Sequence, residues 1–264
     1  MQTLDIVDAD TGVDYGRGVH LDVRVAGGGD RTALVLPGAE RTRENDRFIA
    51  ELANEFEVVV PSHPGFGRSP RPEWCSTVHD LADIYVDWLN RGEHSDVTLV
   101  GLQFGGWVAL EVALRTTRIT HLALVDPVGV KFGGPLDRDI VDVFAMQRAE
   151  LEQRLYHDPR SRLGDLGNAP VEDVLEMARN EEGLAVYGWE PYLHNPNLGR
   201  SLRDIDVPTV VVWGAEDGVV TPAYGRALSE RIPGSRFELV DLAGHRAQVD
   251  RPDAVAKLIT QHSS

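Results

Sequence analysis

The chemistry of this chain centres on position 103, where a glutamine stands in a pattern built for a serine. Residues 97–102 are apolar apart from one threonine, and an apolar helical pattern follows from residue 104. Such a strand, sharp turn and helix present a serine nucleophile in the pattern G-x-S-x-G, but here the letters are Gly101-Leu102-Gln103-Phe104-Gly105. A carboxamide has no acidic proton that a histidine could remove to make a nucleophile. We therefore exclude serine-type covalent attack at this position.

The elements that position Gln103 are indicated by a regular alternation of patterns. Continuous apolar runs are typical of parallel strands covered on both faces, and helical patterns lie between them. A stretch with alternating apolar and polar residues, 19–26, predicts an exposed antiparallel strand. Together these patterns predict an α/β fold with a mostly parallel sheet covered by helices. The apolar runs are 33–36, 58–60, 97–100, 122–125 and 210–212, and the helical patterns are 45–54, 78–90, 104–116 and 223–231.

The alternation stops between residues 131 and 203. Asp137–Tyr156 and Pro170–Tyr187 have amphipathic helical patterns, with no strand pattern between them. A long insertion in a compact domain is usually functional. We therefore predict an α/β core made of residues 1–130 and 204–264, and a helical lid, or cap, made of residues 131–203. A purely structural helical addition is the alternative.

Composition and charge narrow the classes of partner. The formal net charge is −16, which repels nucleic acid and anionic membranes, and no apolar run approaches the ~18 residues of a membrane span. A single cysteine, Cys75, and an N-terminus without a signal-peptide pattern predict a cytoplasmic protein. Metal-ligand spacing is absent, so we expect no metal and no cofactor. A homodimer is compatible with the sequence.

Five segments, in order, make the chain similar to the α/β-hydrolases that carry a lid, a group of esterases, lactonases and C–C hydrolases. The resemblance extends from Leu34 to Ile259. It implies a sheet of about eight strands, with the helical lid between the sixth and the seventh. The segments are Leu36-Pro37-Gly38-Ala39-Glu40, Pro61-Ser62-His63-Pro64-Gly65-Phe66-Gly67-Arg68-Ser69, the turn at Gln103, Trp213-Gly214-Ala215-Glu216-Asp217 and Ala243-Gly244-His245.

The resemblance also implies roles for individual residues. His245 matches the general base, and Asp217 matches the acid that holds the imidazole in one tautomer and stabilises its charged form. Asp126 is the alternative for that acid, because some relatives carry it there. The backbone N–H groups of Phe104 and Ala39 match the two donors of the oxyanion hole.

Four further side chains are expected to bind substrate. Trp189, Tyr192 and Phe132 belong to the aromatic residues that we expect to line an apolar pocket. Arg246 brings a positive charge next to His245 and leaves room for one acidic group. These residues predict a small, largely apolar, carbonyl-bearing substrate.

Three functions fit these residues. In the leading hypothesis, His245 and Asp217 form a general base for lyase, elimination, cyclisation or other non-covalent chemistry, with Gln103 and backbone N–H groups as anchors for an oxyanion or the substrate. The second is water-mediated hydrolysis of an ester, a lactone or a C–C bond, to which an engineered replacement of a native serine also belongs. The third is a non-catalytic pseudo-hydrolase that binds a small ligand. Random decay would have damaged the base and the tight glycines too, which favours a repurposed active site over a dead one.

Overall fold

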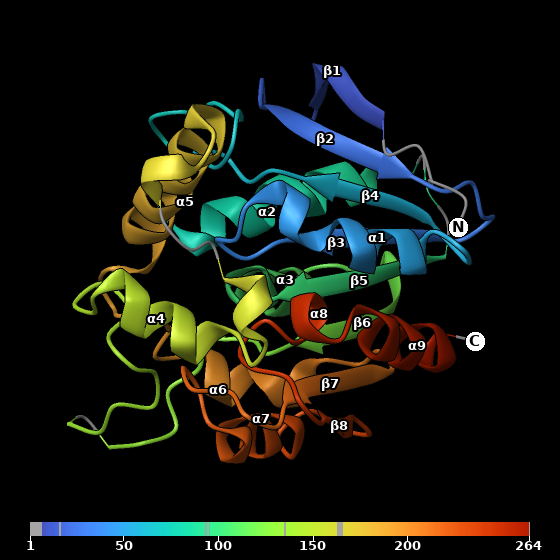
Figure 1. Ribbon diagram of the computed structural model, residues 1–264. Coiled ribbons are helices and arrows are strands. Elements are labelled where there is room, and N and C mark those ends of the chain that lie inside the picture. Colours follow the sequence, from blue (N-terminus) through green and yellow to red (C-terminus); the bar gives the residue numbers. More distant parts are fainter. Residues whose placement is uncertain are drawn as a thin grey trace.

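A single eight-stranded sheet forms the centre of the protein, as seen in the computed structural model, which describes residues 7–15, 17–92, 94, 96–134, 136–162 and 166–263 (Figure 1). The spatial order is β1-β2-β4-β3-β5-β6-β7-β8, and β2 pairs antiparallel with both β1 and β4 while the remaining pairs are parallel. The α/β-hydrolase fold is therefore confirmed, and β1 is a strand that the pattern did not predict. The strands are β1 (Val7–Asp14), β2 (His20–Ala26), β3 (Thr32–Leu36), β4 (Glu57–Pro61), β5 (Val97–Leu102), β6 (Ile119–Val125), β7 (Thr209–Gly214) and β8 (Arg236–Val240).

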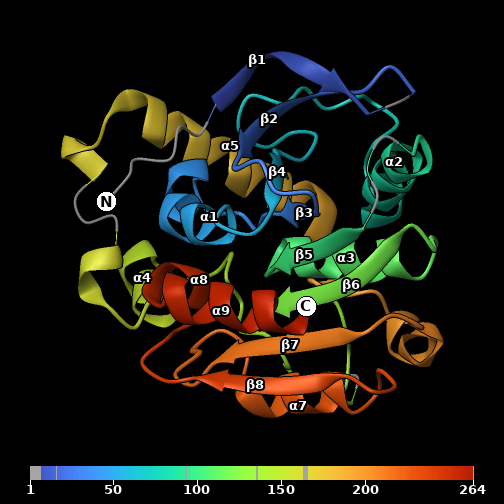
Figure 2. The same ribbon diagram turned by 90° about the vertical axis from the view of Figure 1, so that its right-hand side faces the viewer.

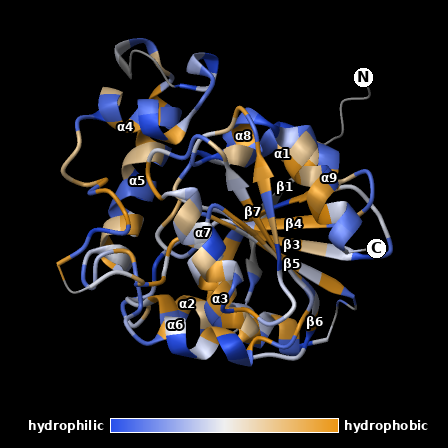
Figure 3. Ribbon diagram, turned by 90° about the horizontal axis from the view of Figure 1, so that it is seen from below, coloured by the Kyte–Doolittle hydropathy of each residue, from blue (hydrophilic) through white to orange (hydrophobic). Residues whose placement is uncertain are grey.

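Helices cover both faces of this sheet (Figures 2 and 3). On one face lie α1 (Asp46–Leu52), α8 (Ala247–Asp250) and α9 (Pro252–His262), and on the other α2 (Val78–Asn90), α3 (Phe104–Ala113) and α7 (Pro222–Ser229). Neighbouring strand residues alternate between two apolar clusters, so that Leu34 packs on the α2–α3 side and Val35 on the α1–α9 side. This double coverage explains why the strand patterns are continuously apolar. No helix in the described part of the chain is long and apolar enough to cross a bilayer.

The segment between β6 and β7 contains helices and, in its described part, no strand. Its longest helix, α5, matches the predicted one, but the prediction of a helix from Asp137 is wrong, because α4 begins only at Arg148. The Asp139 carboxylate accepts the backbone N–H groups of Phe132 and Gly133, which hold the chain in a loop. Whether the segment acts as a lid stays a prediction. It consists of α4 (Arg148–Leu155), α5 (Val171–Gly188), α6 (Leu198–Ser201) and the short 3₁₀ turns η2 (Pro159–Ser161), η3 (Leu166–Asn168) and η4 (Leu202–Asp204).

The inserted segment packs against the loops that follow β3 and β4. Asn180 of α5 accepts the backbone N–H of Gly67 at 2.8 Å and donates to the backbone oxygen of Glu40 at 2.9 Å. Tyr187, about two turns further along the same helix, donates its hydroxyl to the Pro64 oxygen at 2.9 Å. These bonds place the insertion over the carboxyl ends of the strands, next to Gln103 at the end of β5.

The turn between β5 and α3 is too tightly packed for side chains at its glycines. Gln103 has φ 45° and ψ −106°, outside the usual regions for a residue with a side chain. A Cβ on Gly105 would lie 2.0 Å from the Leu36 oxygen, and one on Gly106 would lie 2.6 Å from Cβ of Pro127. The strained turn is therefore fixed by close contact with the end of β3 and with Pro127, just after β6.

Gly105→Ala should lower the free energy of unfolding by about 2–3 kcal/mol, because the new methyl group forces the start of α3 away from the end of β3. Urea unfolding followed by circular dichroism measures the change. Gly28→Ala is the matched control, since a Cβ there meets nothing within 4 Å, and its stability should equal that of the wild type. Equal stability of the two variants would contradict a tightly packed turn.

Candidate active site

His245 and Asp217 are brought together by neighbouring strands. They follow β8 and β7, which are parallel and paired, so their loops meet at one edge of the sheet. His245 Nδ1 lies 2.8 Å from Asp217 Oδ2, and both side chains are buried. The other carboxylate oxygen accepts the backbone N–H groups of Val219 and Val220 at 2.8 and 2.9 Å. Because a carboxylate only accepts, Nδ1 carries the proton, and the lone pair of a neutral His245 is on Nε2.

Asp126, the alternative acid, has different partners. Its oxygens accept the backbone N–H groups of Gly214 at 2.7 Å and Ala247 at 3.1 Å, so it joins β7 to the start of α8. Burial, reinforced by the charge of Asp217, raises the pKa of the Asp126 carboxyl well above its ordinary value. The structure therefore pairs His245 with Asp217, and Asp126 holds the loop that carries His245.

The Gln103 amide is paired with a second buried glutamine. Gln103 Nε2 donates to Gln248 Oε1 at 3.0 Å, and Gln248 Nε2 donates back to Gln103 Oε1 at 3.3 Å. A further, long contact of 3.5 Å joins Gln103 Nε2 to the Val125 oxygen. The amide N–H bonds are thus directed at protein acceptors, and a lone pair of Oε1 remains. The expectation that this amide donates to an oxyanion is corrected: in this geometry Gln103 offers an acceptor.

Gln248 continues a chain of buried polar side chains. It also donates to Asn45 Oδ1 at 3.2 Å, and Asn45 Nδ2 donates to Glu40 Oε1 at 2.7 Å. The backbone N–H of Gly38 reaches the same Glu40 oxygen at 3.1 Å. Sequence reasoning missed Gln248, Asn45 and Glu40 as site residues. The available signals were a glutamine three positions after His245 and a glutamate directly after Ala39.

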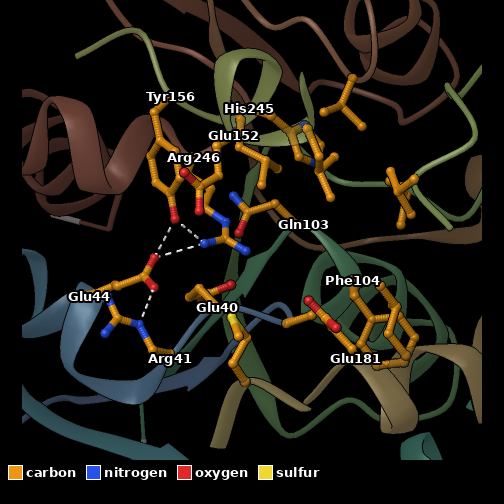
Figure 4. A pocket seen from close by; sticks show the side chains of 18 of the residues that line it. Glu40, Arg41, Glu44, Gln103, Phe104, Glu152, Tyr156, Glu181, His245 and Arg246 are labelled. Atoms are coloured by element: carbon orange, nitrogen blue, oxygen red, sulfur yellow. Dashed lines mark hydrogen bonds and ion pairs between the residues drawn. The ribbon is translucent and has the colours of Figure 1, made fainter. Parts of the chain in front are cut away.

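A cavity with about 900 Å³ of free space, its open mouth included, contains His245 and Gln103 in its wall (Figure 4). Ala39 and Phe104, the two residues expected to form the oxyanion hole, line it as well, and their role there stays a prediction. No group of three or more His, Cys, Asp or Glu side chains among the described residues could hold a metal ion. The apolar part of the wall consists of Phe104, Val128, Val143, Leu151, Leu155, Met177, Leu184, Leu193 and Val219.

Three of the four predicted substrate-binding side chains lie outside this cavity. Trp189 is 62% exposed and packs on Phe144, with ring centroids 5.3 Å apart. The Tyr192 hydroxyl is bound to backbone groups of the loop before α4, and Phe132 packs edge-on against Tyr224 at 4.7 Å. The expectation that Trp189, Tyr192 and Phe132 line the cavity is therefore wrong. Aliphatic side chains of α4 and α5 take their place.

Arg246 lines the cavity, but Glu44 already binds part of its guanidinium group (Figure 4). Arg246 Nη1 and the Tyr156 hydroxyl both donate to Glu44 Oε2, at 2.7 and 2.5 Å, and Arg41 Nε donates to Glu44 Oε1 at 2.9 Å. Burial alone would raise the pKa of the Glu44 carboxyl, but the charge of Arg246 and the bonds from Tyr156 and Arg41 outweigh it and lower the pKa. The room expected for an acidic substrate group at Nη1 is thus taken by Glu44.

Gln248→Ala should destabilise the fold by about 1–3 kcal/mol, because it leaves buried polar groups of Gln103 and Asn45 unpaired. A double-mutant cycle with Gln103→Ala, measured by urea unfolding, should give a coupling energy of about 1 kcal/mol. The exposed Gln153→Ala is the control and should change stability by less than about 0.5 kcal/mol. Additive effects of the two substitutions would contradict the pairing.

Glu44→Gln should cost about 3 kcal/mol at pH 7, because it removes the carboxylate that accepts from the largely buried Arg246 and leaves Arg41 with Asp173 alone. A lowered pKa means that ionised Glu44 stabilises the fold above the unfolded-state pKa of about 4.3, and that this stabilisation is lost as the pH falls further. The difference from the wild type should therefore narrow below about pH 4.3. Urea unfolding between pH 3.5 and 7 measures it, with the exposed Glu55→Gln as control. A gap that is constant with pH would contradict the ionised cluster.

The chain is similar in sequence to known alpha/beta hydrolases. The model of the alpha/beta hydrolase family matches residues 33–258. A 2-hydroxymuconate semialdehyde hydrolase of a Pseudomonas species is 26% identical over 223 residues, covering 80% of this chain and 77% of the relative. A 2-hydroxy-6-oxo-2,4-heptadienoate hydrolase of Pseudomonas putida is 24% identical and covers 92% of both chains.

Solved structures show the same fold over nearly the whole chain. The 2-hydroxy-6-oxo-6-phenylhexa-2,4-dienoate hydrolase of a Rhodococcus species superposes with a TM-score of 0.77 and 22% identity, covering 98% of this chain and 99% of that one. A thermophilic esterase of Thermogutta terrifontis gives a TM-score of 0.74 at 23% identity, covering 95% and 96%. With most of its length matched by the family model, this chain belongs to the alpha/beta hydrolase family.

Proposed function

We propose that this protein is an enzyme that uses His245, oriented by Asp217, as a general base on a small, largely apolar, carbonyl-bearing substrate without forming a covalent intermediate. The observation that carries the proposal is the 2.8 Å bond from His245 to Asp217 beside a cavity whose residue 103 offers no nucleophile. Two backbone N–H groups fix the far oxygen of Asp217. A base held in this way is positioned for proton transfer, which contributes ~10²–10⁴-fold to a rate.

The proposed reaction divides its tasks among three parts of the cavity wall. His245 Nε2 takes a proton from the substrate or from a water molecule. The backbone N–H groups of Ala39 and Phe104 receive the substrate carbonyl oxygen as negative charge develops on it. The Oε1 atom of Gln103 accepts a hydrogen bond and so orients the group that loses or carries a proton. The apolar side chains of α4 and α5 cover the remainder of the substrate, which makes the inserted segment 131–203 a lid in this proposal.

The relatives support a carbonyl-bearing substrate. Two of them are named as hydrolases of a muconate semialdehyde and of an oxo-heptadienoate, both of which contain a carbonyl group beside a conjugated chain. Water-mediated hydrolysis of an ester, a lactone or a C–C bond uses the same base and the same oxyanion donors. It is the second candidate, and the products of turnover distinguish it from elimination or cyclisation.

His245→Ala should lower turnover by about 100-fold or more, because the site loses its base. A suitable panel contains 4-nitrophenyl acetate, a γ-lactone and a 2-hydroxy-6-oxo-dienoate, followed by absorbance, together with deuterium exchange next to a ketone carbonyl followed by NMR. His79→Ala is the matched control: this histidine is exposed and outside the cavity, and its removal should leave turnover unchanged. Turnover that survives in His245→Ala would contradict the proposal, and binding of the panel without any turnover would favour the non-catalytic alternative.

Gln103→Ser tests the absence of a covalent intermediate in the same assays. Intact-mass measurement with 4-nitrophenyl acetate should show no acyl adduct on the wild type and an acyl adduct on Gln103→Ser, because only a hydroxyl beside His245 can be activated as a nucleophile. An adduct on the wild-type protein that disappears in His245→Ala would overturn the non-covalent mechanism.

A further inference from the structure

Glu40 has one carboxylate oxygen held by the protein and one without a partner. Its side chain is 4% exposed, and Oε1 accepts from the Gly38 backbone at 3.1 Å and from Asn45 at 2.7 Å. Oε2 is buried and makes no hydrogen bond to the part of the chain that the structure describes. A buried carboxylate oxygen without a donor costs free energy, so a group that supplies a donor would bind there favourably.

The free oxygen of Glu40 lies beside the acceptor atom of Gln103. A Cβ built on Gly38 would be 2.5 Å from Glu40 Oε2 and 3.0 Å from Gln103 Oε1, so both oxygens converge on the same glycine. Glu40 and Gln103 both line the cavity that holds His245, and Ala39, directly before Glu40, lines it too (Figure 4). This corner of the cavity therefore places acceptor oxygens next to the residues expected to hold a carbonyl oxygen.

The number of free acceptors in this corner indicates which chemical group of a ligand would bind there. Gln103 Oε1 already accepts from Gln248 at 3.3 Å, which leaves Glu40 Oε2 as the acceptor with no donor at all. A hydroxyl group brings one donor and matches this single acceptor. An ammonium group brings three donors and would leave at least one of them unpaired in a buried corner.

We propose that Glu40 Oε2 accepts a hydrogen bond from a hydroxyl group of the substrate, so that the enzyme acts on hydroxy-carbonyl compounds. The carbonyl oxygen meets the N–H groups of Ala39 and Phe104, and the neighbouring hydroxyl points to Glu40. This assignment rests on the proposed function for the place of the carbonyl. The hydroxyl subsite itself is a binding site, and binding does not need His245.

Binding of three ligands that differ in one group tests the subsite. They are phenacyl alcohol, its methyl ether and phenacylamine (2-amino-1-phenylethanone) in its ammonium form, each titrated against the full-length protein and followed by NMR. The wild type should bind the alcohol about tenfold more tightly than the ether, which keeps the carbonyl and the ring but has no donor. Equal affinity for alcohol and ether would overturn the proposal without any variant, and a preference for the ammonium ligand would overturn the assignment to a hydroxyl.

Glu40→Gln should abolish the preference for the alcohol. In this variant the amide oxygen keeps the bonds from Gly38 and Asn45, and the amide NH₂ group replaces the oxygen that has no partner, so no existing hydrogen bond is lost. The ligand-free variant should therefore melt no lower than the wild type, whereas a purely structural Glu40 predicts a lower melting temperature with unchanged selectivity. The exposed Glu51→Gln is the matched control and should keep the preference.

His245→Ala separates this proposal from the proposed function. The variant should keep the roughly tenfold preference for the alcohol while losing turnover, because the subsite binds and the histidine transfers protons. Loss of the preference in His245→Ala with an intact fold would contradict a subsite centred on Glu40. If no compound is turned over but the preference persists, the general-base proposal fails and the hydroxyl subsite stands.

Discussion

A buried carboxamide must have its hydrogen bonds satisfied, and the site of this protein is arranged around that constraint. Gln103 is 5% exposed at a strained turn, so most of its hydrogen-bonding capacity must be met by the protein. Gln248 meets it from α8, and the polar chain continues through Asn45 to Glu40. Loops after β3, β5 and β8 are thereby joined. Gln103 thus leaves no gap in the site, because the polar groups of this chain come from the segments that follow β3 and β8.

The same arrangement separates two kinds of polar group in one cavity wall. His245 and Asp217 form a hydrogen-bonded pair in which backbone N–H groups bind the far oxygen of Asp217, while Nε2 of His245 is left for a ligand. In the cluster of Arg41, Glu44 and Arg246, both cations donate to Glu44, and Arg41 also pairs with Asp173. What remains for a ligand includes the imidazole, the unpartnered carboxylate oxygens of Glu40 and Glu152, the backbone N–H groups of the oxyanion residues and an aliphatic surface. A small polar head on an apolar body matches that distribution better than a polyanion does.

Several parts of this picture could be predicted from the sequence because they depend on local pattern. Strands buried on both faces are continuously apolar, and β7 and β8 each end just before a residue with acid–base chemistry, so Asp217 and His245 were identifiable. The pairing of Gln103 with Gln248 spans 145 positions and depends on the course of α8, which no local pattern encodes. In the insertion, amphipathic patterns identified α5 but did not show which face lines the cavity. The sequence pattern therefore predicts a cavity wall of aromatic residues such as Trp189, whereas aliphatic side chains of α4 and α5 line the cavity.

The amide of Gln103 also reverses the hydrogen-bonding character of the turn between β5 and α3: the turn presents an acceptor to a substrate instead of a hydroxyl. A serine there would supply a hydroxyl that attacks, whereas Gln103 has its donors engaged and presents an acceptor. Backbone N–H groups of Ala39 and Phe104 would supply donors on the same wall, so donors and acceptors face the cavity within one small region. A substrate with only a carbonyl would use the donors and leave Glu40 unpaired. A substrate with a carbonyl and a neighbouring hydroxyl satisfies both, and its binding would remove the free-energy cost that the buried oxygen imposes on the empty protein.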